Sequence, residues 1–579
     1  MKGKIIVIFI FMLMIANAIF IAQGNIPHCS EIPYNTAGQP VNDNTEWWPM
    51  FHHDIQISGF TPSDSPDTNK KLWENQIDSD IWFSSPAIVN DELLIGTGER
   101  YGEKPKNRQE VMDFYETQLF MKEKTFFDII EKENRPITGE IGKLYRLNAR
   151  TGEILWEFEA NGSVFSSPSI ENGLVYFVSA DSQNYTGKLY CLNIDSGNEV
   201  WSLPVMSGFA TPTLHDGKLY VLTINPDDYY GRLQCLNAAD GSEVWNYTTG
   251  YIDFSLYTAP ALTDGKVFFT SVDVTTGIHC KISCLNQSTG QLLWATKISE
   301  MNFGYALSSP VIDNKKAFVI SADTEGVDQF WCVLTCFDTS NGSILWNYTM
   351  KEETNDELSF SSPAVAYGNV YFALVGSGWI YGKIMCLNAE NGTMQWVHKS
   401  NDAYTASSPI ISDGKVFVGG VNLTLFEGKL YCFDAFTGNL TYTAFIENGF
   451  IDSTPAIADE VLYVCSQAGK VCAFEDVFKV GEIKGGLATV KADITNVGGY
   501  DIEDLHGTIT VTGGLFNLIN TQKNYSISLL EAQTSDTIKA FPILGFGKIQ
   551  ITITAELEGV NPVVKKADGF VFGLFVIIR

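Results

Sequence analysis

Basic residues are scarce in this 579-residue sequence, which has 38 lysines and arginines against 67 aspartates and glutamates. The formal net charge is −29 at pH 7. Because the chain lacks the basic stripe that would neutralise nucleic-acid phosphates, we expect no nucleic-acid partner. Aromatic residues make up 13% and charged residues 18% of the chain, a balance that indicates a folded protein with a large core.

Motifs of common enzyme classes are also absent. The sequence has no H-E-x-x-H zinc motif, no G-x-S-x-G nucleophile turn and no phosphate-binding P-loop. It also has no spaced cluster of metal-ligand residue types. Neither hydrolytic nor nucleotide chemistry is therefore supported, and we assign no catalytic, cofactor-binding or metal residue.

The N-terminus has the features of an export signal. Lys2 and Lys4 precede an apolar run from Ile5 to Ala22, and Ala22-Gln23-Gly24 is typical of signal-peptidase cleavage. We predict a signal peptide over residues 1–24 and an extracellular or cell-surface protein. The run is also long enough to span a bilayer, so an uncleaved anchor is the alternative, and only then is a membrane contact expected.

Candidate glycosylation sites are frequent, as expected for an exported protein. The chain has ten N-x-[ST] sequons, and several of them recur with an internal repeat. Their asparagines are Asn161, Asn184, Asn246, Asn286, Asn341, Asn347, Asn391, Asn422, Asn439 and Asn524.

An internal repeat occupies most of the chain. Each copy has a Ser/Thr/Ala-Pro step, β-rich runs and a T-G-x-x-x-W ending. After the first interval the prolines are 44 to 53 residues apart, which is the length of a four-stranded propeller blade. The sequence therefore predicts an all-β protein with an eight-bladed β-propeller. The prolines are Pro86, Pro168, Pro212, Pro260, Pro310, Pro363, Pro409 and Pro455.

Between residues 47 and 476 the repeat resembles the quinoprotein (PQQ-like) propeller repeat, whose docking motif is A-x-D-x-x-T-G-K-x-x-W. The second copy runs from Cys191 through Gly197 to Trp201. The resemblance implies that the small first residue receives an indole from a neighbouring blade, so that the aromatic residues form a girdle. These structural docking residues are Trp73, Trp156, Trp201, Trp245, Trp294, Trp346, Trp396 and Tyr442.

The two ends of the repeat region complement each other. The last repeat stops near Glu475 without an outer-strand tryptophan, whereas residues 70–77 contain Trp73 and no preceding strands. We predict that strand 70–77 completes blade 8 of a propeller over residues 70–476. Residues 25–69 form an N-terminal extension, in which His52, His53 and Asp54 serve in a plug or in packing rather than as metal ligands.

Cysteines are placed for packing rather than for disulfides. Six of them lie ten residues before a docking aromatic residue, where the repeat consensus has alanine. Cys465 and Cys472 differ, because a two-residue turn at Ala468-Gly469 would place them opposite each other. They form either a cross-strand disulfide or two buried thiols. The six are Cys191, Cys235, Cys284, Cys336, Cys386 and Cys432.

Two regions fall outside the repeat. Residues 99–141 have apolar residues at helical spacing and predict a helical insertion, which is either a partner surface or a helix packed on the propeller's flank. Residues 477–579 alternate apolar and polar residues and predict an immunoglobulin-like β-sandwich. We expect its apolar segment 569–578 to be a buried last strand.

The resemblance implies two alternative functions. Alcohol-oxidising members of the family hold PQQ with calcium or a lanthanide, an acidic base and commonly a pair of adjacent cysteines, but this chain has no Cys-Cys dipeptide. Its candidate acids lie in turns: Asp181, Asp227, Asp228, Asp273 and Asp323. We therefore predict a non-catalytic binding or scaffolding protein without a cofactor, similar in build to outer-membrane assembly lipoproteins but without their lipobox cysteine. A protein or cell-surface ligand would bind the propeller faces or the helical insertion. The alternative is a PQQ-dependent dehydrogenase with a non-standard site.

Overall fold

The computed structural model describes residues 47–98 and 142–578, with short gaps in both ranges. The predicted signal peptide and the helical insertion at 99–141 therefore lie outside the described residues. No helix in the described ranges is long and apolar enough to cross a membrane. The gaps are residues 82, 182–185, 206–209, 226, 229, 252–257, 274–278, 299–303, 307, 326–328, 351–356, 360, 377–380, 405–406, 423–424, 426, 448, 499–500 and 559.

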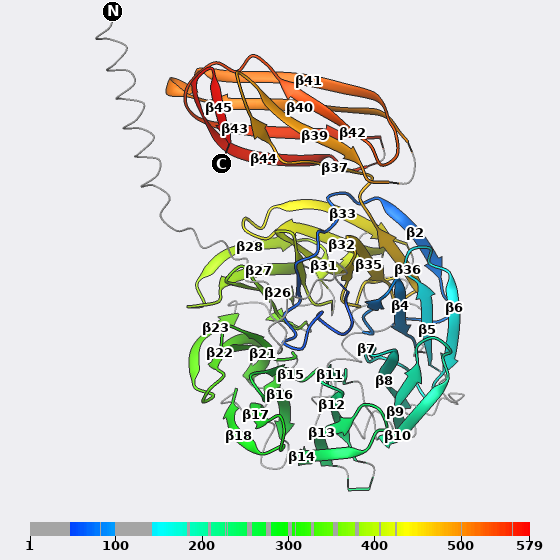
Figure 1. Cartoon of the computed structure of the whole chain (residues 1–579). Coiled ribbons are helices and arrows are strands. Elements are labelled where there is room, and N and C mark those ends of the chain that lie inside the picture. The colour runs from blue at the N-terminus through cyan, green and yellow to red at the C-terminus, as the bar shows by residue number, and fades with distance from the viewer. Residues whose placement is uncertain are drawn as a thin grey trace, which may run out of the picture. The chain divides into compact units, whose positions relative to one another are not determined.

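The described strands between Phe60 and Phe474 pair into eight sheets that follow one another around a ring (Figure 1). The predicted all-β fold is therefore confirmed. The sheets are numbered here as blades 1 to 8 in the order of their inner strands along the chain, and each is given below with its inner strand first. Blade 1 has β3 (Ala87–Val89), β4 (Glu92–Gly96), β5 (Lys143–Asn148) and β6 (Ile154–Glu159); blade 2 has β7 (Ser169–Glu171), β8 (Leu174–Asp181), β9 (Thr186–Asn193) and β10 (Glu199–Val205); blade 3 has β11 (Thr213–His215), β12 (Lys218–Ile224), β13 (Tyr230–Asn237) and β14 (Glu243–Tyr251); blade 4 has β15 (Ala261–Thr263), β16 (Lys266–Asp273), β17 (His279–Asn286) and β18 (Leu292–Lys297). Blade 5 has β20 (Val311–Asp313), β21 (Lys316–Glu325), β22 (Gln329–Asp338) and β23 (Ile344–Met350), with β19 (Gly304–Ala306); blade 6 has β25 (Ala364–Ala366), β26 (Asn369–Gly376), β27 (Gly382–Asn388) and β28 (Met394–Ser400), with β24 (Glu357–Leu358); blade 7 has β30 (Ile410–Ser412), β31 (Lys415–Asn422), β32 (Glu427–Asp434) and β33 (Leu440–Ile446), with β1 (Phe60–Thr61) and β29 (Ala403–Tyr404); blade 8 has β34 (Ala456–Ala458), β35 (Val461–Cys465), β36 (Lys470–Phe474) and β2 (Lys71–Gln76).

Two-residue turns join each short inner strand to the next strand. In blade 2 the turn residues Asn172 and Gly173 both have positive φ, 53° and 75°. Asp216 and Gly217 repeat this conformation in blade 3, at 50° and 67°. Two successive positive φ angles favour Asn-Gly and Asp-Gly, and their twist matches that of the flanking strands. N-G or D-G pairs occupy this turn in blades 2, 3, 4 and 7, and the other four blades adopt the same positive φ angles with Asn-Asp, Asn-Lys, Tyr-Gly and Asp-Glu pairs.

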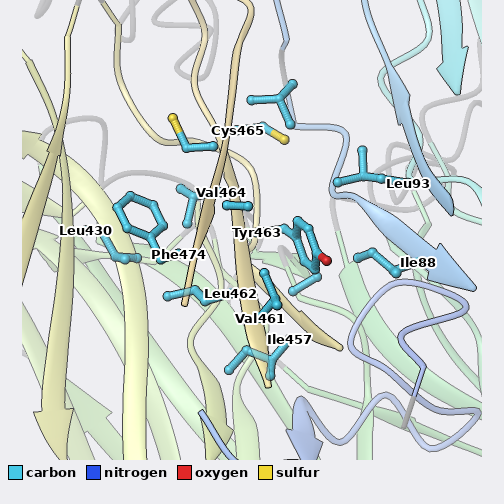
Figure 2. Packing of buried hydrophobic residues seen from close by; sticks show 14 of the residues in the cluster. Ile88, Leu93, Leu430, Ile457, Val461, Leu462, Tyr463, Val464, Cys465 and Phe474 are labelled. Atoms are coloured by element: carbon cyan, nitrogen blue, oxygen red, sulfur yellow. The ribbon is translucent and has the colours of Figure 1, made fainter. Parts of the chain in front are cut away.

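Blade 8 contains both ends of the repeat region. Strand β2 pairs antiparallel with β36, and Trp73 lies opposite Ala473. All five residues of β36 are buried. Figure 2 shows the packing around this blade, where Leu462 and Phe474 lie in one cluster with Leu430 of blade 7 and Ile88 of blade 1.

Residues 477–578 form two antiparallel sheets around a separate core. One sheet has β37 (Phe478–Val480), β38 (Lys484–Gly485), β39 (Val490–Asn496) and β42 (Ser535–Ala540). The other runs in the order β41 (Ile519–Leu530), β40 (Ile502–Gly513), β43 (Gly545–Glu556), β44 (Val563–Gly573) and β45 (Phe575–Ile578). Residues of both sheets, such as Val490 and Ile551, share the core. This is a β-sandwich, and its immunoglobulin-like topology stays a prediction.

The expected burial of segment 569–578 is wrong. Val571 and Val576 are buried, but Phe572 is 47% and Phe575 60% exposed. Successive residues of a strand face opposite sides, so a strand that is apolar on both faces can bury only one of them here. The exposed face is considered below.

Candidate functional site

The inner strands of the ring are crossed by the segment from Trp48 to Gly59, which we call the plug. Its backbone bonds to the middle residue of the inner strand in six blades. The bonds run from Ile88 N to Trp48 O at 2.8 Å, Ile170 N to Pro49 O at 2.9 Å, Leu262 N to Ile55 O at 2.6 Å, Ile312 N to Gln56 O at 3.0 Å, Val365 N to Ser58 O at 2.8 Å and Ile411 N to Gly59 O at 2.8 Å.

The plug is held by the residues that the sequence marked as His-His-Asp. His52 is fully buried, and its Nδ1 lies 3.2 Å from the Ile57 carbonyl oxygen. The Asp54 carboxylate accepts bonds from the backbone N–H groups of Gln56 and Ser58, at 3.0 and 2.9 Å. In the described residues no three His, Cys, Asp or Glu side chains come together as metal ligands would. His52 and Asp54 therefore shape the plug itself.

The buried His52 gives a pH-dependent contribution to stability. Burial lowers its pKa from 6.5 to about 4. Because the folded pKa lies below the unfolded one, this contribution is present above pH 6.5 and is lost as the pH falls from 6.5 to 4. His52→Gln should remove up to about 3 kcal/mol of that acid sensitivity. Urea unfolding of both proteins across this window measures it, and parallel pH profiles would contradict the prediction.

A ring of interblade hydrogen bonds surrounds the axis at the Ser/Thr-Pro steps. In seven of these steps the backbone N–H of the residue before proline donates to the hydroxyl at the same position of the next blade. The eighth step, at Thr211, lacks this acceptor because the equivalent residue of the next blade, Ala259, has no hydroxyl. The bonds are Ser85 to Ser167 at 3.0 Å, Ser167 to Thr211 at 3.1 Å, Ala259 to Ser309 at 2.9 Å, Ser309 to Ser362 at 3.0 Å, Ser362 to Ser408 at 2.9 Å, Ser408 to Thr454 at 3.2 Å and Thr454 to Ser85 at 3.0 Å.

In this hydroxyl ring the side chains of the repeated Ser/Thr-Pro steps form hydrogen bonds within the fold. The preceding serines are used as well, since the Ser166 Oγ donates to Val178 O at 3.0 Å and the Ser308 Oγ accepts the Ile320 N–H at 2.8 Å. These hydroxyls are buried and bonded within the fold. They are fixed parts of the ring rather than free ligand groups.

Removing one hydroxyl should lower stability because it leaves a buried N–H donor without an acceptor. Ser408→Ala leaves the Ser362 N–H without its acceptor, and we expect a loss of about 1–3 kcal/mol in the free energy of unfolding. Ser408→Thr is the matched control, since Thr454 fills the same position in blade 8. Equal unfolding midpoints for both variants in urea would show that this bond contributes nothing.

The docking tryptophans link adjacent blades at the outer edge. Each indole Nε1 donates to a backbone carbonyl of the next blade, and a Cβ added to that blade's turn glycine would lie 2.4–3.0 Å from the indole. The donors and acceptors are Trp73 and Ala149, Trp156 and Ile194, Trp201 and Ala238, Trp245 and Gln287, Trp294 and Thr339, Trp346 and Ala389, and Trp396 and Ala435, while the Tyr442 hydroxyl donates to Pro66 O.

This geometry corrects two details of the docking prediction. The glycine and the carbonyl receive the neighbouring indole, whereas the cysteine pairs with the tryptophan of its own blade, as Cys191 does with Trp201. Burial is also incomplete. Trp245 and Trp396 are 8% exposed, but the other five docking tryptophans are only partly buried.

The expected facing of Cys465 and Cys472 is wrong. Both are free thiols, and the register places Cys465 opposite Val471 and Cys472 opposite Val464. The two side chains therefore point to opposite faces of the hairpin. Burial raises the pKa of both thiols, to about 12 for Cys472, so they are inert packing groups.

The candidate acids do not gather at one point in the described structure. Asp181 is buried in blade 2, while Asp227 and Asp228 are exposed in blade 3, where Asp228 pairs with Arg232. Asp273 and Asp323 follow in blades 4 and 5, and their side chains lie outside the described set.

Sequence reasoning missed an ion cluster around the buried Lys415 and Asp476, where the two ends of the repeat region meet. Lys415 Nζ lies 2.7 Å from Asp67 Oδ1 and 2.9 Å from Asp413 Oδ2, and Asp476 Oδ1 accepts the backbone N–H of Asp67 at 2.8 Å. Burial and the Asp67 charge raise the pKa of Asp476 to about 7. The pairing joins residues hundreds of positions apart, so only the fold reveals it.

Most sequons are accessible. The asparagines are exposed except Asn286 and Asn422, which are half-buried, and Asn184, which lies outside the described residues. The exposed asparagines are Asn161, Asn246, Asn341, Asn347, Asn391, Asn439 and Asn524.

Comparisons with known proteins agree with this architecture. A family model described as outer membrane protein assembly factor BamB matches residues 133–186, 182–277 and 260–476. The quinohemoprotein alcohol dehydrogenase of Comamonas testosteroni shares the fold at 11% identity, with a TM-score of 0.52 over 76% of this chain and 83% of that chain. BamB of Moraxella catarrhalis is 14% identical, with a TM-score of 0.46 over 70% of this chain and 97% of that chain. No curated protein sequence matches the chain.

Proposed function

Because this chain belongs to the PQQ-like repeat family of propellers, we propose that it is a non-catalytic binding or scaffolding protein acting outside the cytoplasm. The family's model carries the description of an assembly factor, which supports a protein partner. We infer that the eight sheets are the eight blades predicted from the prolines. The partner would bind the propeller faces or the insertion at 99–141.

The observation that carries this proposal is the chemistry of the inner strands. The eight strands contain no lysine or arginine, and the hydroxyls beside them are already bonded within the ring. PQQ has three carboxylates, which need basic side chains or a divalent cation to offset their charge. The donor set on the described inner strands does not fit PQQ.

Export is supported by independent features of the chain. Residues 1–24 have the pattern of a signal peptide, and seven of the ten sequon asparagines are exposed. Asn341, Asn391 and Asn439 lie in turns between the two outer strands of their blades. Asn161 follows the outer strand β6 and lies at the opposite end of its blade, so the exposed sequons do not single out one face for the partner.

A titration with PQQ separates the two candidate functions. We expect no binding by calorimetry and no dye-linked oxidation of alcohols or sugars, with or without added calcium. In the described residues no group of carboxylates gathers to hold a calcium ion, so added calcium should not rescue binding. Micromolar PQQ affinity would overturn the scaffold proposal in favour of the dehydrogenase.

Crosslinking in the cell envelope tests the binding role directly. Lysine crosslinks from the propeller to one recurrent polypeptide are expected, and mass spectrometry would place them on one face of the ring. Crosslinks scattered over all faces at the abundance of bystander proteins would contradict a dedicated partner.

A further inference from the structure

One end of the C-terminal sandwich exposes large apolar side chains. They lie in three segments, 514–518, 541–546 and 572–575, which we call the apolar tip. Phe516 is 91% and Leu518 80% exposed, and Phe541 and Phe575 are each 60% exposed. Soluble proteins seldom leave so many large apolar side chains together in water, so the tip indicates a binding surface.

The three segments form one continuous surface. The N–H of Gly514 donates to Lys548 O at 2.6 Å, which joins the first segment to the strand that follows the second. Phe546 lies opposite Phe572, and their rings meet edge to face with centroids 5.4 Å apart. In Figure 1 the strands β40, β41, β43 and β44 run side by side along this domain, and their turns at one end make the tip.

The turn in segment 514–518 exposes its apolar residues in a strained backbone conformation. Phe516 has a φ of 58° and Asn517 a φ of 56°, a conformation that favours glycine or asparagine over phenylalanine. None of the three residues of this turn (Leu515–Asn517, η2) is buried. Phe516 is therefore exposed in a strained turn and has no packing role in the core.

Charge is distributed unevenly along the sandwich. Residues 512–520, 541–549 and 569–578 contain no carboxylate and one charged residue, the exposed Lys548, in a chain whose net charge is −29. Six of the domain's ten carboxylates lie at the far end, where Ile502 pairs with Leu530 and His506 with Glu556. They are Asp501, Glu503, Asp504, Glu531, Glu556 and Glu558. One other carboxylate, the exposed Asp568, borders the tip, because it lies opposite Gln550 on the strand that carries Lys548. The far end of the domain is therefore acidic, whereas the three segments at the tip carry one lysine and no carboxylate.

We propose that the apolar tip inserts into the interfacial region of a lipid bilayer. Aromatic side chains favour this region, and a lysine beside them can reach anionic headgroups. Projecting turns enter a fluid interface without needing the complementary cavity that a protein partner would have to provide. The tip segments carry no carboxylate, which weakens at this end of the domain the repulsion that the rest of this acidic chain would feel at an anionic surface. The tip gives the protein a membrane contact that does not depend on residues 1–24.

Hydrogen exchange of the full chain with vesicles of phosphatidylcholine and phosphatidylglycerol tests the proposal. We expect slower exchange in peptides covering 512–520, 541–548 and 570–577 when vesicles are added, and no change in the propeller. Phe516→Ser combined with Leu518→Ser should raise the lipid concentration for half-maximal protection at least about tenfold. Both side chains are exposed, so the variant should fold.

Matched controls make the result specific to the tip. Leu293→Ser with Leu345→Ser removes two exposed apolar side chains, 47% and 46% exposed, from outer propeller strands and should not change protection of the tip. Because the apolar run at residues 5–22 binds vesicles if it is retained, exchange at the tip is the deciding readout. Vesicle binding without protection of the tip would overturn the proposal. So would protection that needs no lipid and grows with protein concentration, because the tip would then be a self-association surface.

Discussion

Replacing Trp396 by alanine is expected to lower the free energy of unfolding by about 3–5 kcal/mol. This indole is 8% exposed and donates to the Ala435 carbonyl of blade 7 at 2.9 Å. Truncation removes most of its apolar contact and leaves that carbonyl without its hydrogen-bond donor in the interface between blades 6 and 7. Chemical unfolding measures the loss. A change below about 1 kcal/mol would show that the girdle contributes little.

The receiving glycine supplies a second, independent test of the same contact. Gly438 has a φ of 70°, and a Cβ there would lie 2.5 Å from the Trp396 ring. Gly217 has a φ of 67° with nothing within 4 Å of the added Cβ. Gly217→Ala should cost only the backbone strain of about 1–2 kcal/mol. Gly438→Ala should cost about 1–3 kcal/mol more, because the indole must move. Equal losses would mean that the indole is not seated on the glycine.

The turn and strand pattern was readable because local chemistry determines it. The N-G and D-G pairs set the inner turns of four blades, and the tryptophan endings mark outer strands, so strand positions followed from the spacing of the repeat. What spacing does not give is the partner across the interface. Cys191 and Trp201 are ten residues apart because they pair within one blade, and the neighbouring indole meets Gly197 instead.

Register was less predictable where a loop makes a tertiary contact. Gln467 N donates to Phe450 O at 2.8 Å, and the Ser466 N–H bonds to Lys470 O at 2.9 Å. The hairpin therefore turns around a longer loop than Ala468-Gly469, which shifts the pairing by one residue and turns Cys465 and Cys472 away from each other.

The hydroxyl ring and the apolar tip each needed the folded chain, as did the backbone bonds by which the predicted plug meets six blades. The Ser-Pro steps showed hydroxyls near the axis, but whether a hydroxyl is free or bonded to the next blade depends on interblade spacing. Segment 569–578 is apolar at nearly every position, so neither period nor composition distinguishes the buried Val571 from the exposed Phe572. Tertiary packing alone decides which face meets the core.

Removing residues 1–77 is expected to abolish cooperative folding. This chain would lack the plug and strand β2, leaving β36 as an unpaired edge although all five of its residues are buried in the complete ring. It also loses the Trp73 indole, which donates to Ala149 O at 2.8 Å, and Glu74, whose carboxylate lies 2.6 Å from Lys470 Nζ. The indole alone is worth about 3–5 kcal/mol, a large part of the roughly 5–15 kcal/mol that stabilises a typical domain.

A chain that begins at Glu46 is the matched control, since it keeps the plug, β1 and β2. It should elute as a monomer in size-exclusion chromatography with light scattering and unfold in a cooperative thermal transition. The shorter chain should form soluble oligomers or aggregates instead, because an exposed apolar edge strand pairs with other chains. If it stays monomeric and unfolds at the same temperature, the N-terminal strand does not close the ring. The stability of blade 8 would then have to come from its contacts with blades 1 and 7, where Ile88 and Leu430 pack against it.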